Sequence, residues 1–217
     1  MEVELNRRPA CVLFGCDGTL VDSELLGNIA LAQRLALACI AETGEALTAR
    51  FRGHQLADML AALERQHRSA LPADFVADDR RHAAAIFETG VVAMPGVDAA
   101  LRRLDLPMCV VSNGPLAKIR QHLRVAGLVR HFGECLFSAY EIGSWKPDPG
   151  LFLHAARAMG AAPRDGIVVD DSSAGIEAAG RAGRRAPWCV ASCTPDEVPP
   201  HATAFSDMAA LPDLVSG

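Results

Sequence analysis

Short apolar runs, each followed by small or acidic residues, alternate with amphipathic segments along most of the chain. Continuous apolar runs of this length are typical of strands in a parallel sheet that is covered on both faces. We predict strands at residues 10–14, 108–111, 135–137, 167–169 and 188–191. Helical spacing of apolar residues predicts helices at 97–104, 116–126, 151–159 and 174–182. This alternation predicts an α/β fold with a doubly wound parallel sheet.

The pattern changes between residues 22 and 94. Amphipathic segments at 25–41, 57–67 and 75–89 predict three helices, and none of the β-branched runs typical of the sheet lies among them. We interpret residues 22–94 as a small helical cap domain inserted after the first strand. The Rossmann-like core domain is then residues 1–21 and 95–217, which the chain re-enters at Met94, Pro95 and Gly96.

Composition narrows the possible functions of the 217-residue chain. Its net charge is -5, which does not indicate a basic surface for binding nucleic acid. No apolar run reaches the roughly 18–20 residues needed to cross a membrane, and the charged N-terminal segment does not resemble a secretory signal. Seven scattered cysteines, an odd number, are typical of reduced thiols. We expect a cytoplasmic monomer or weak homodimer with neither a nucleic-acid nor a membrane partner.

Polar residues follow three of the predicted strands where each ends. Asp17 follows the first strand, Ser112 the second, and the pair Asp170 and Asp171 the fourth. Ligands of open α/β sheets bind outside these carboxyl ends, so we expect the side chains to surround one site. Ordinary turn chemistry also favours these residue types, but it explains any single turn better than all of them together.

The loops carry four motifs whose order and spacing resemble those of the haloacid dehalogenase superfamily. The motifs are Gly15-Cys16-Asp17-Gly18-Thr19-Leu20, Val110-Val111-Ser112-Asn113-Gly114, Lys146-Pro147-Asp148-Pro149 and Val169-Asp170-Asp171-Ser172-Ser173. The helical insertion falls where subclass I caps of that superfamily lie, and the resemblance extends over residues 10–211. It favours the β-phosphoglucomutase and phosphatase branch, and within that branch a sugar-phosphate phosphatase.

The resemblance implies a Mg²⁺-dependent phosphomonoesterase that acts on a small phosphorylated metabolite. In the family an aspartate attacks phosphorus while Mg²⁺ bridges it to the phosphate. Asp17 matches the second carboxylate, which protonates the leaving oxygen and then activates water, and its carbonyl ligates the metal. Asp171 matches a direct ligand, with Asp170 beside it or acting through water.

The resemblance also assigns the phosphate contacts. Ser112 and the amides of Asn113 and Gly114 match the groups that hydrogen-bond phosphate oxygens, and Lys146 matches the cation that faces them. Three plainer alternatives stay open. Lys146 could be a solvated loop lysine, Ser112 could cap the helix that follows it, and Asp170 with Asp171 could cap the helix that begins near residue 174.

The cap loop offers a further candidate contact at Arg52 and Gly53, where Gly53 would allow close approach to the core. Arg52 could contact a substrate anion or equally could face solvent. The mutases of this branch use a histidine and an arginine in the cap, and the matching positions here are Gly27 and Leu56. Their absence favours a hydrolase over a mutase.

Cysteine and histidine positions give no metal-binding spacing. We expect the seven histidines at the surface or in the cap. Alternate residues of an extended segment face opposite sides, so we expect Gly15 and Asp17 to share a face while Cys16 points into the core.

Gly15 departs from the family pattern, which has the nucleophilic aspartate at this position. Glycine has no side chain that could attack phosphorus or bind a metal ion, so we expect catalysis by this chain to be severely impaired. Either a pseudoenzyme lineage has lost its nucleophile, or the change is a recent substitution. The alternative function is a non-catalytic protein that binds or senses a phosphorylated metabolite.

Overall fold

Within the part of the chain that the structure describes, six parallel strands form the central sheet, in the order β5–β4–β1–β6–β7–β8. The computed structural model describes residues 9–51, 54–183, 188–190 and 203–216. The strands are β1 (Cys11–Phe14), β4 (Met108–Ser112), β5 (Leu136–Ser138), β6 (Gly166–Asp170), β7 (Trp188–Val190) and β8 (Thr203–Phe205). Further strands are added on both sides of β1, β4 and β5 on one side and β6, β7 and β8 on the other. The carboxyl end of β1 is therefore the switch point of a doubly wound sheet.

The structure confirms the predicted parallel α/β sheet. The five predicted strands correspond to β1, β4, β5, β6 and β7 within one residue at each described end, while residue 191 lies outside the described residues. Strand β8 was missed because it has three residues at the edge of the sheet and no continuous apolar run. An edge strand of that length carries little pattern for sequence reasoning to detect.

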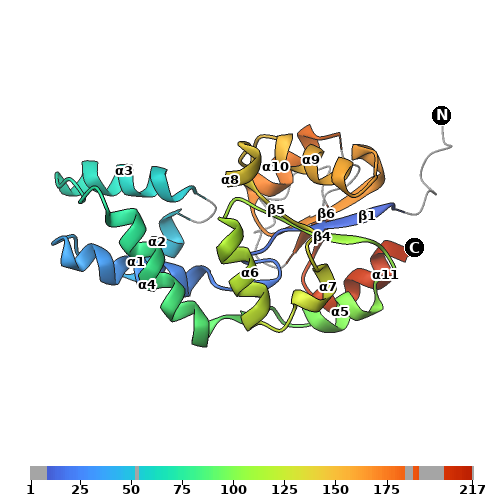
Figure 1. The fold of residues 1–217 in the computed structure, drawn as a ribbon, viewed down its shortest axis with the longest axis horizontal. Coiled ribbons are helices and arrows are strands. Elements are labelled where there is room, and N and C mark those ends of the chain that lie inside the picture. The colour runs from blue at the N-terminus through green and yellow to red at the C-terminus, as the bar shows by residue number, and fades with distance from the viewer. Residues whose placement is uncertain (1–8, 52–53, 184–187, 191–202, 217) are drawn as a thin grey trace.

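Side chains of β1 alternate between two apolar layers. Val12 and Phe14 pack in one hydrophobic cluster, and Cys11 and Leu13 pack in the other. The first face is covered by α5 (Val97–Arg103), α6 (Leu116–Val125), α7 (Val129–Phe132), the 3₁₀ turn η3 (Met208–Ala210) and α11 (Leu211–Ser216) (Figure 1). The second is covered by α8 (Ala139–Ile142), α9 (Gly150–Ala158) and α10 (Ser173–Arg181), with a 3₁₀ turn η1 (Pro163–Asp165) ahead of β6.

The described residues of the cap form four helices, and the cap lies to one side of the sheet in Figure 1. They are α1 (Glu24–Leu37), α2 (Gly44–Phe51), α3 (Leu56–His67) and α4 (Phe75–Gly90). The predicted helices correspond to α1, α3 and α4, whereas α2, which ends at Phe51, was not predicted. The cap has its own hydrophobic cluster around Leu35 and Leu63.

A two-stranded antiparallel pair joins the cap to the core. Strand β2 (Val21–Asp22) leads into the cap, and β3 (Val92–Ala93) leads out of it. This pair lies where we propose the domain boundaries, at residues 22 and 94. Within the described residues no helix is both long and apolar enough to span a membrane.

Helix α4 is the part of the cap that packs most closely on the core, against α6. The Gln121 side chain donates from Nε2 to the Ala84 carbonyl at 2.7 Å, and Arg124 pairs with Glu88 at 2.6 Å. The Phe87 ring meets the His122 ring edge to face, with centroids 4.4 Å apart. The site at the sheet ends is therefore covered by a cap face that α4 holds in place.

Helix α4 also carries a buried acid, Asp79, whose side chain is 6% exposed. Its Oδ1 has no hydrogen-bond partner among the described residues. Burial raises the pKa of Asp79 from an ordinary 3.8 to about 6, although the charges of His82, Arg34 and Arg80 oppose the shift. Ionisation of Asp79 at neutral pH therefore lowers the stability of the folded cap.

Asp79→Asn should stabilise the protein near neutral pH. A raised pKa means that the folded state binds the proton more tightly than the unfolded state, so stability falls as pH rises from about 4 to 6. The amide avoids that loss, and we expect an increase in unfolding free energy on the order of 1–3 kcal/mol at about pH 8 but little change at about pH 4.

Urea unfolding at both pH values measures this effect. Asp78→Asn is the matched control, because Asp78 pairs with Arg34 at 2.9 Å and its neutralisation should destabilise at about pH 8. A gain for Asp79→Asn that is equal at the two pH values would contradict the proposed cause.

Candidate active site

The motif loops meet at the carboxyl ends of the three central strands. Phe14 of β1 pairs with Val110 of β4 and Val169 of β6, so the loops that follow these residues lie side by side. Between the loops and the cap is a pocket of about 480 Å³. Its lining includes Gly15, Asp17, Ser112, Asn113, Gly114, Lys146, Asp170 and Asp171.

Lys146 and Asp170 form a buried ion pair in this pocket. The Lys146 Nζ donates to Asp170 Oδ2 at 2.6 Å and to the Val111 carbonyl at 2.8 Å. Both side chains are almost fully buried, at 6% and 3% exposure, and the ammonium lies 5.1 Å from the centre of the Phe152 ring. The alternative interpretation of Lys146 as a solvated loop lysine is therefore wrong.

Asn113 holds the Lys146 loop against the end of β4. Its Oδ1 accepts from the Lys146 amide at 2.8 Å, and its Nδ2 donates to the Lys146 carbonyl at 3.2 Å. The sequence pointed only to the Asn113 amide. The structure shows that the side chain fixes the backbone that carries the lysine.

Asp170 and Asp171 are held in place by the first turn of α10 and by the β1 loop. Ser172 donates from Oγ to Asp170 Oδ1 at 2.7 Å, and Thr19 donates from Oγ1 to Asp171 Oδ1 at 2.7 Å. A Cβ at Gly175 would lie 2.2 Å from Asp170, so only glycine fits there.

Neither capping alternative is correct. Ser172 is the N-cap of α10 and accepts from the Gly175 amide at 3.0 Å, so the two aspartates do not cap that helix. Pro115 is the N-cap of α6. Ser112 instead accepts from the Gly114 amide at 3.0 Å, within its own loop. Ser112 itself is 4% exposed, and its hydroxyl proton is available to a ligand in the pocket.

Gly15 lies directly beside the ion pair. Its amide donates to the Val169 carbonyl at 2.8 Å, which fixes the backbone at the end of β1. A Cβ built on Gly15 would lie 2.8 Å from Asp170 Oδ2 and 2.6 Å from Thr19 Oγ1. A side chain at this position would therefore point at Asp170, and it would need Thr19 or Asp170 to move.

The Asp17 carboxylate points towards α6. Its Oδ1 accepts from Ser23 Oγ at 2.5 Å and lies 2.9 Å from His122 Nδ1, while its Oδ2 accepts from Lys118 Nζ at 3.1 Å. Burial opposes ionisation, but Lys118, His122 and Ser23 hold the pKa of Asp17 well below its ordinary value. Asp17 is therefore a carboxylate in this arrangement.

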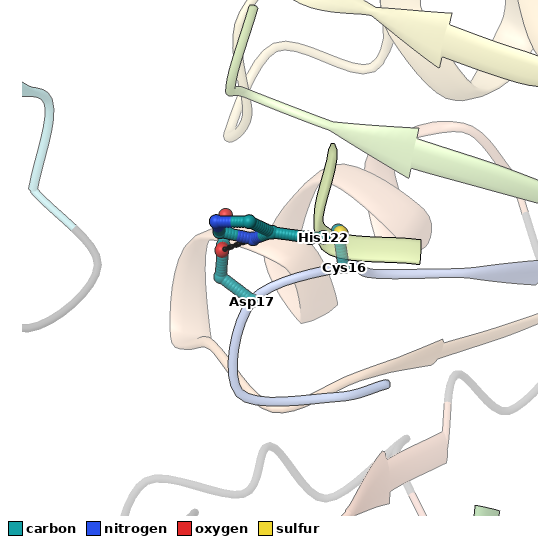
Figure 2. A group of neighbouring side chains, drawn as sticks. All are labelled: Cys16, Asp17 and His122. Carbon is teal, nitrogen blue, oxygen red and sulfur yellow. Dashed lines mark ion pairs between the residues drawn. The ribbon is translucent and has the colours of Figure 1, made fainter. Parts of the chain in front are cut away.

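Sequence reasoning missed Lys118 and misplaced His122. We expected His122 at the surface or in the cap, but it is fully buried on core helix α6, so that expectation is wrong. Lys118 and His122 are four residues apart, which places both on one face of α6. That spacing, directly after the Ser112 motif, is a signal that could have directed both side chains to the site. Figure 2 shows the His122 ring facing the Asp17 carboxylate.

Cys16 is buried in the core, at 3% exposure, as the alternation of side chains predicted. The alternation does not continue to Asp17, however, because β1 ends at Phe14 and the chain turns. The Cys16 and Asp17 ligand atoms lie within 4.8 Å of each other and of a His122 nitrogen. The expected separation of Cys16 and Asp17 onto opposite faces is therefore wrong.

The donor chemistry of the pocket fits a magnesium ion. Asp170 and Asp171 are adjacent buried carboxylates, 2% and 5% exposed, and oxygen ligands are those that Mg²⁺ prefers. The Asp17 side chain is turned towards α6. The expected binding of the metal ion by the Asp17 main-chain carbonyl stays a prediction. Arg52 and Gly53 lie outside the described residues, whereas Gly27 and Leu56 line the pocket.

Comparison with known proteins gives close relatives along almost the whole chain. It is 35% identical over 211 residues to 6-phosphogluconate phosphatase of Escherichia coli (strain K12), covering 95% of each chain. It is 31% identical over 172 residues to hexitol phosphatase A of the same organism, covering 76% of this chain and 75% of that one. A solved structure of a conserved haloacid dehalogenase-like protein of unknown function from Agrobacterium tumefaciens str. C58 has a TM-score of 0.79 and 30% identity, covering 95% of this chain and 97% of that one.

The family described as haloacid dehalogenase-like hydrolase matches residues 9–183, which include the four motif loops and the cap. The fold with its inserted cap agrees with that match. We therefore conclude that this chain belongs to the haloacid dehalogenase-like hydrolase family.

Proposed function

We propose that this chain has the scaffold of a Mg²⁺-dependent sugar-phosphate phosphatase whose turnover is severely impaired by Gly15. The observation that carries the proposal is the convergence of Ser112, Lys146, Asp170 and Asp171 on one pocket, with the side-chain position of residue 15 directed at Asp170. These groups supply the phosphate donors and the metal-binding carboxylates, but residue 15 supplies no nucleophile.

A phosphate group would bind at the Ser112 loop. The Ser112 hydroxyl can donate to it, and the Lys146 ammonium has three protons, of which two are directed at Val111 and Asp170. The third can face the phosphate. Lys118, which also lines the pocket, adds a second cation beside Asp17. Together these groups offset the charge of a phosphate dianion in a chain that is acidic overall.

Magnesium would be held by Asp170, Asp171 and the Asp17 carbonyl. Bound there, it would supply positive charge that neutralises the phosphate oxygens. Asp17 has a separate role as the acid–base carboxylate. Ser23, Lys118 and His122 hold it ionised and turned towards α6, beside the Ser112 loop, so in this arrangement it is ready to accept a proton. Its Oδ2 lies 3.9 Å from the position that a Cβ on Gly114 would take. The family reaction also requires a carboxylate at residue 15 to attack phosphorus, and glycine has none.

The cap side of the pocket suits a polyhydroxylated substrate. Asn28, Thr48, Asp79 and Arg80 line it with groups that donate or accept hydrogen bonds. The relatives named above act on 6-phosphogluconate and on hexitol phosphates by their names, and both are phosphorylated chains bearing hydroxyls. We propose a sugar phosphate such as 6-phosphogluconate as the ligand.

One observation favours a second candidate function, a protein that binds a phosphorylated metabolite without turnover. Thr19 and Asp170 lie closer to the Gly15 Cβ position than a real side chain would allow. The site has thus packed around glycine while keeping its phosphate-binding groups.

Gly15→Asp should restore Mg²⁺-dependent phosphatase activity on sugar phosphates. Removal of a catalytic nucleophile costs on the order of 10⁴-fold or more, and we expect a gain of that order over the unaltered chain. Steady-state phosphate release from a panel of sugar phosphates measures it. Gly15→Asn is the matched control, because it makes the same steric demand on Thr19 and Asp170 without adding a carboxylate. Full phosphatase activity of the unaltered chain, equal to that of Gly15→Asp, would refute the impairment, whereas no activity in either protein would favour the binding protein.

Magnesium should bind more weakly to this chain than to its Gly15→Asp variant. The variant adds one oxygen ligand to a set that otherwise consists of Asp170, Asp171 and a carbonyl, and Mg²⁺ requires near-octahedral oxygen coordination. Calorimetric titration of both proteins, with Gly15→Asn as control, tests the ligand set. Equal affinities in all three proteins would show that residue 15 does not face the metal.

The unaltered chain should still bind 6-phosphogluconate, because its phosphate donors are intact. Lys146→Ala removes a charge-assisted hydrogen bond, worth about 1.5–3 kcal/mol, and should weaken binding by about 10- to 100-fold. That change also leaves the Asp170 charge buried without its partner. The control is therefore the double variant Lys146→Ala with Asp170→Asn, which removes the unpaired charge and so separates lost binding from lost stability. Binding that is unchanged in Lys146→Ala would place the phosphate elsewhere.

A further inference from the structure

Cys16, Asp17 and His122 bring three different ligand atoms together. A thiol sulfur, a carboxylate oxygen and an imidazole nitrogen lie within 4.8 Å of one another (Figure 2). Cys16 and Asp17 are on the loop after β1, and His122 is on α6. Sulfur, nitrogen and oxygen donors in this combination suit zinc and related transition ions, whereas magnesium prefers oxygen alone.

The His122 imidazole is unsatisfied in this setting. It is fully buried, and neither ring nitrogen makes a hydrogen bond of good geometry with any described residue. Nδ1 lies 2.9 Å from Asp17 Oδ1, a close contact without suitable hydrogen-bond angles. A buried polar group without a hydrogen bond is costly and therefore calls for an explanation. A metal ion between the nitrogen, the carboxylate and the sulfur would provide one.

The surroundings leave one carboxylate oxygen for such an ion. Lys118 pairs with Asp17 Oδ2 at 3.1 Å, while Oδ1 faces His122 and accepts from Ser23 Oγ at 2.5 Å, which leaves one lone pair of Oδ1 for the ion. Cys16 and Asp17 both line the pocket, so an ion could enter from it. Burial and the neighbouring Asp17 charge raise the pKa of the Cys16 thiol, so an ion would have to displace its proton on binding.

We propose that Cys16, Asp17 and His122 form a binding site for Zn²⁺ or a similar transition ion, which uses the Asp17 carboxylate and not the Asp17 carbonyl proposed for the magnesium site with Asp170 and Asp171. Three protein ligands leave a fourth position for water or a ligand from the pocket. A metal ion bound at this site would hold the Asp17 carboxylate as one of its ligands. The site requires no turnover, so it can be tested on the unaltered Gly15 chain.

Cobalt titration of the reduced full-length chain tests the site directly. Bound Co²⁺ should show sulfur-to-metal charge-transfer absorption together with visible bands of a four-coordinate ion, and one equivalent of Zn²⁺ should abolish both. Excess Mg²⁺ should leave them unchanged. Absence of the charge-transfer band, or its loss on adding Mg²⁺, would overturn the proposal.

Two variants identify the ligands. Cys16→Ser should abolish the charge-transfer band, and His122→Phe, which keeps an aromatic ring against Phe87, should weaken Zn²⁺ binding by at least about 10-fold. Cys39→Ser is the control for binding at an exposed thiol and should retain the full spectrum. Circular dichroism confirms that each variant is folded. If one Cys16 or His122 variant fails to fold, Asp17→Asn replaces it, with the same loss of affinity expected. A band that persists in folded Cys16→Ser, or disappears in Cys39→Ser, would show that the metal binds elsewhere.

Discussion

The buried contact between Lys146 and Asp170, 2.6 Å long, joins the elements around which the site is built. Taking two charges out of water is costly, and such a pair is tolerated only where the remaining hydrogen-bonding capacity is also satisfied. The Val111 carbonyl and the Ser172 hydroxyl meet that requirement. The pair thereby links the end of β4, the end of β6 and the start of α10. Removal of one partner alone from such a pair typically costs about 3–5 kcal/mol.

Glycines surround this pair because its atoms leave no room for side chains. Gly175 allows the first turn of α10 to approach Asp170, and Gly15 allows the β1 loop to do the same. At Gly175 the close approach serves the ion pair itself. At Gly15, Thr19 and Asp170 occupy the space that the side chain of a nucleophile would need. The packing thus accommodates the glycine that we propose impairs turnover. A carboxylate at residue 15 would add negative charge beside Asp170, which a bound cation would have to balance.

Asp17 belongs to a second network that connects the site to the cap. Its carboxylate contacts Lys118 and His122 on α6, and His122 packs against Phe87 on α4 of the cap. The position of the cap and the orientation of the proposed acid–base carboxylate thus depend on the same helix face. This is why α6 contributes to the site although none of its residues was among the candidates from the sequence.

The sequence by itself determined the doubly wound sheet, the inserted cap and the four loops that meet in the pocket. Those features follow from local patterns: apolar runs such as 108–111, and polar residues at their ends. It did not determine α2 or β8, whose short segments carry little periodicity, nor the surroundings of Asp17 and His122. Only the tertiary structure decided that Asp17 turns towards α6. His122 lies 105 residues away along the chain, and only the packing of α6 on the core brings it next to Asp17. Local patterns specify which elements form and which residues end them. The contacts that orient a side chain arise from packing between elements distant in sequence, which no local pattern contains.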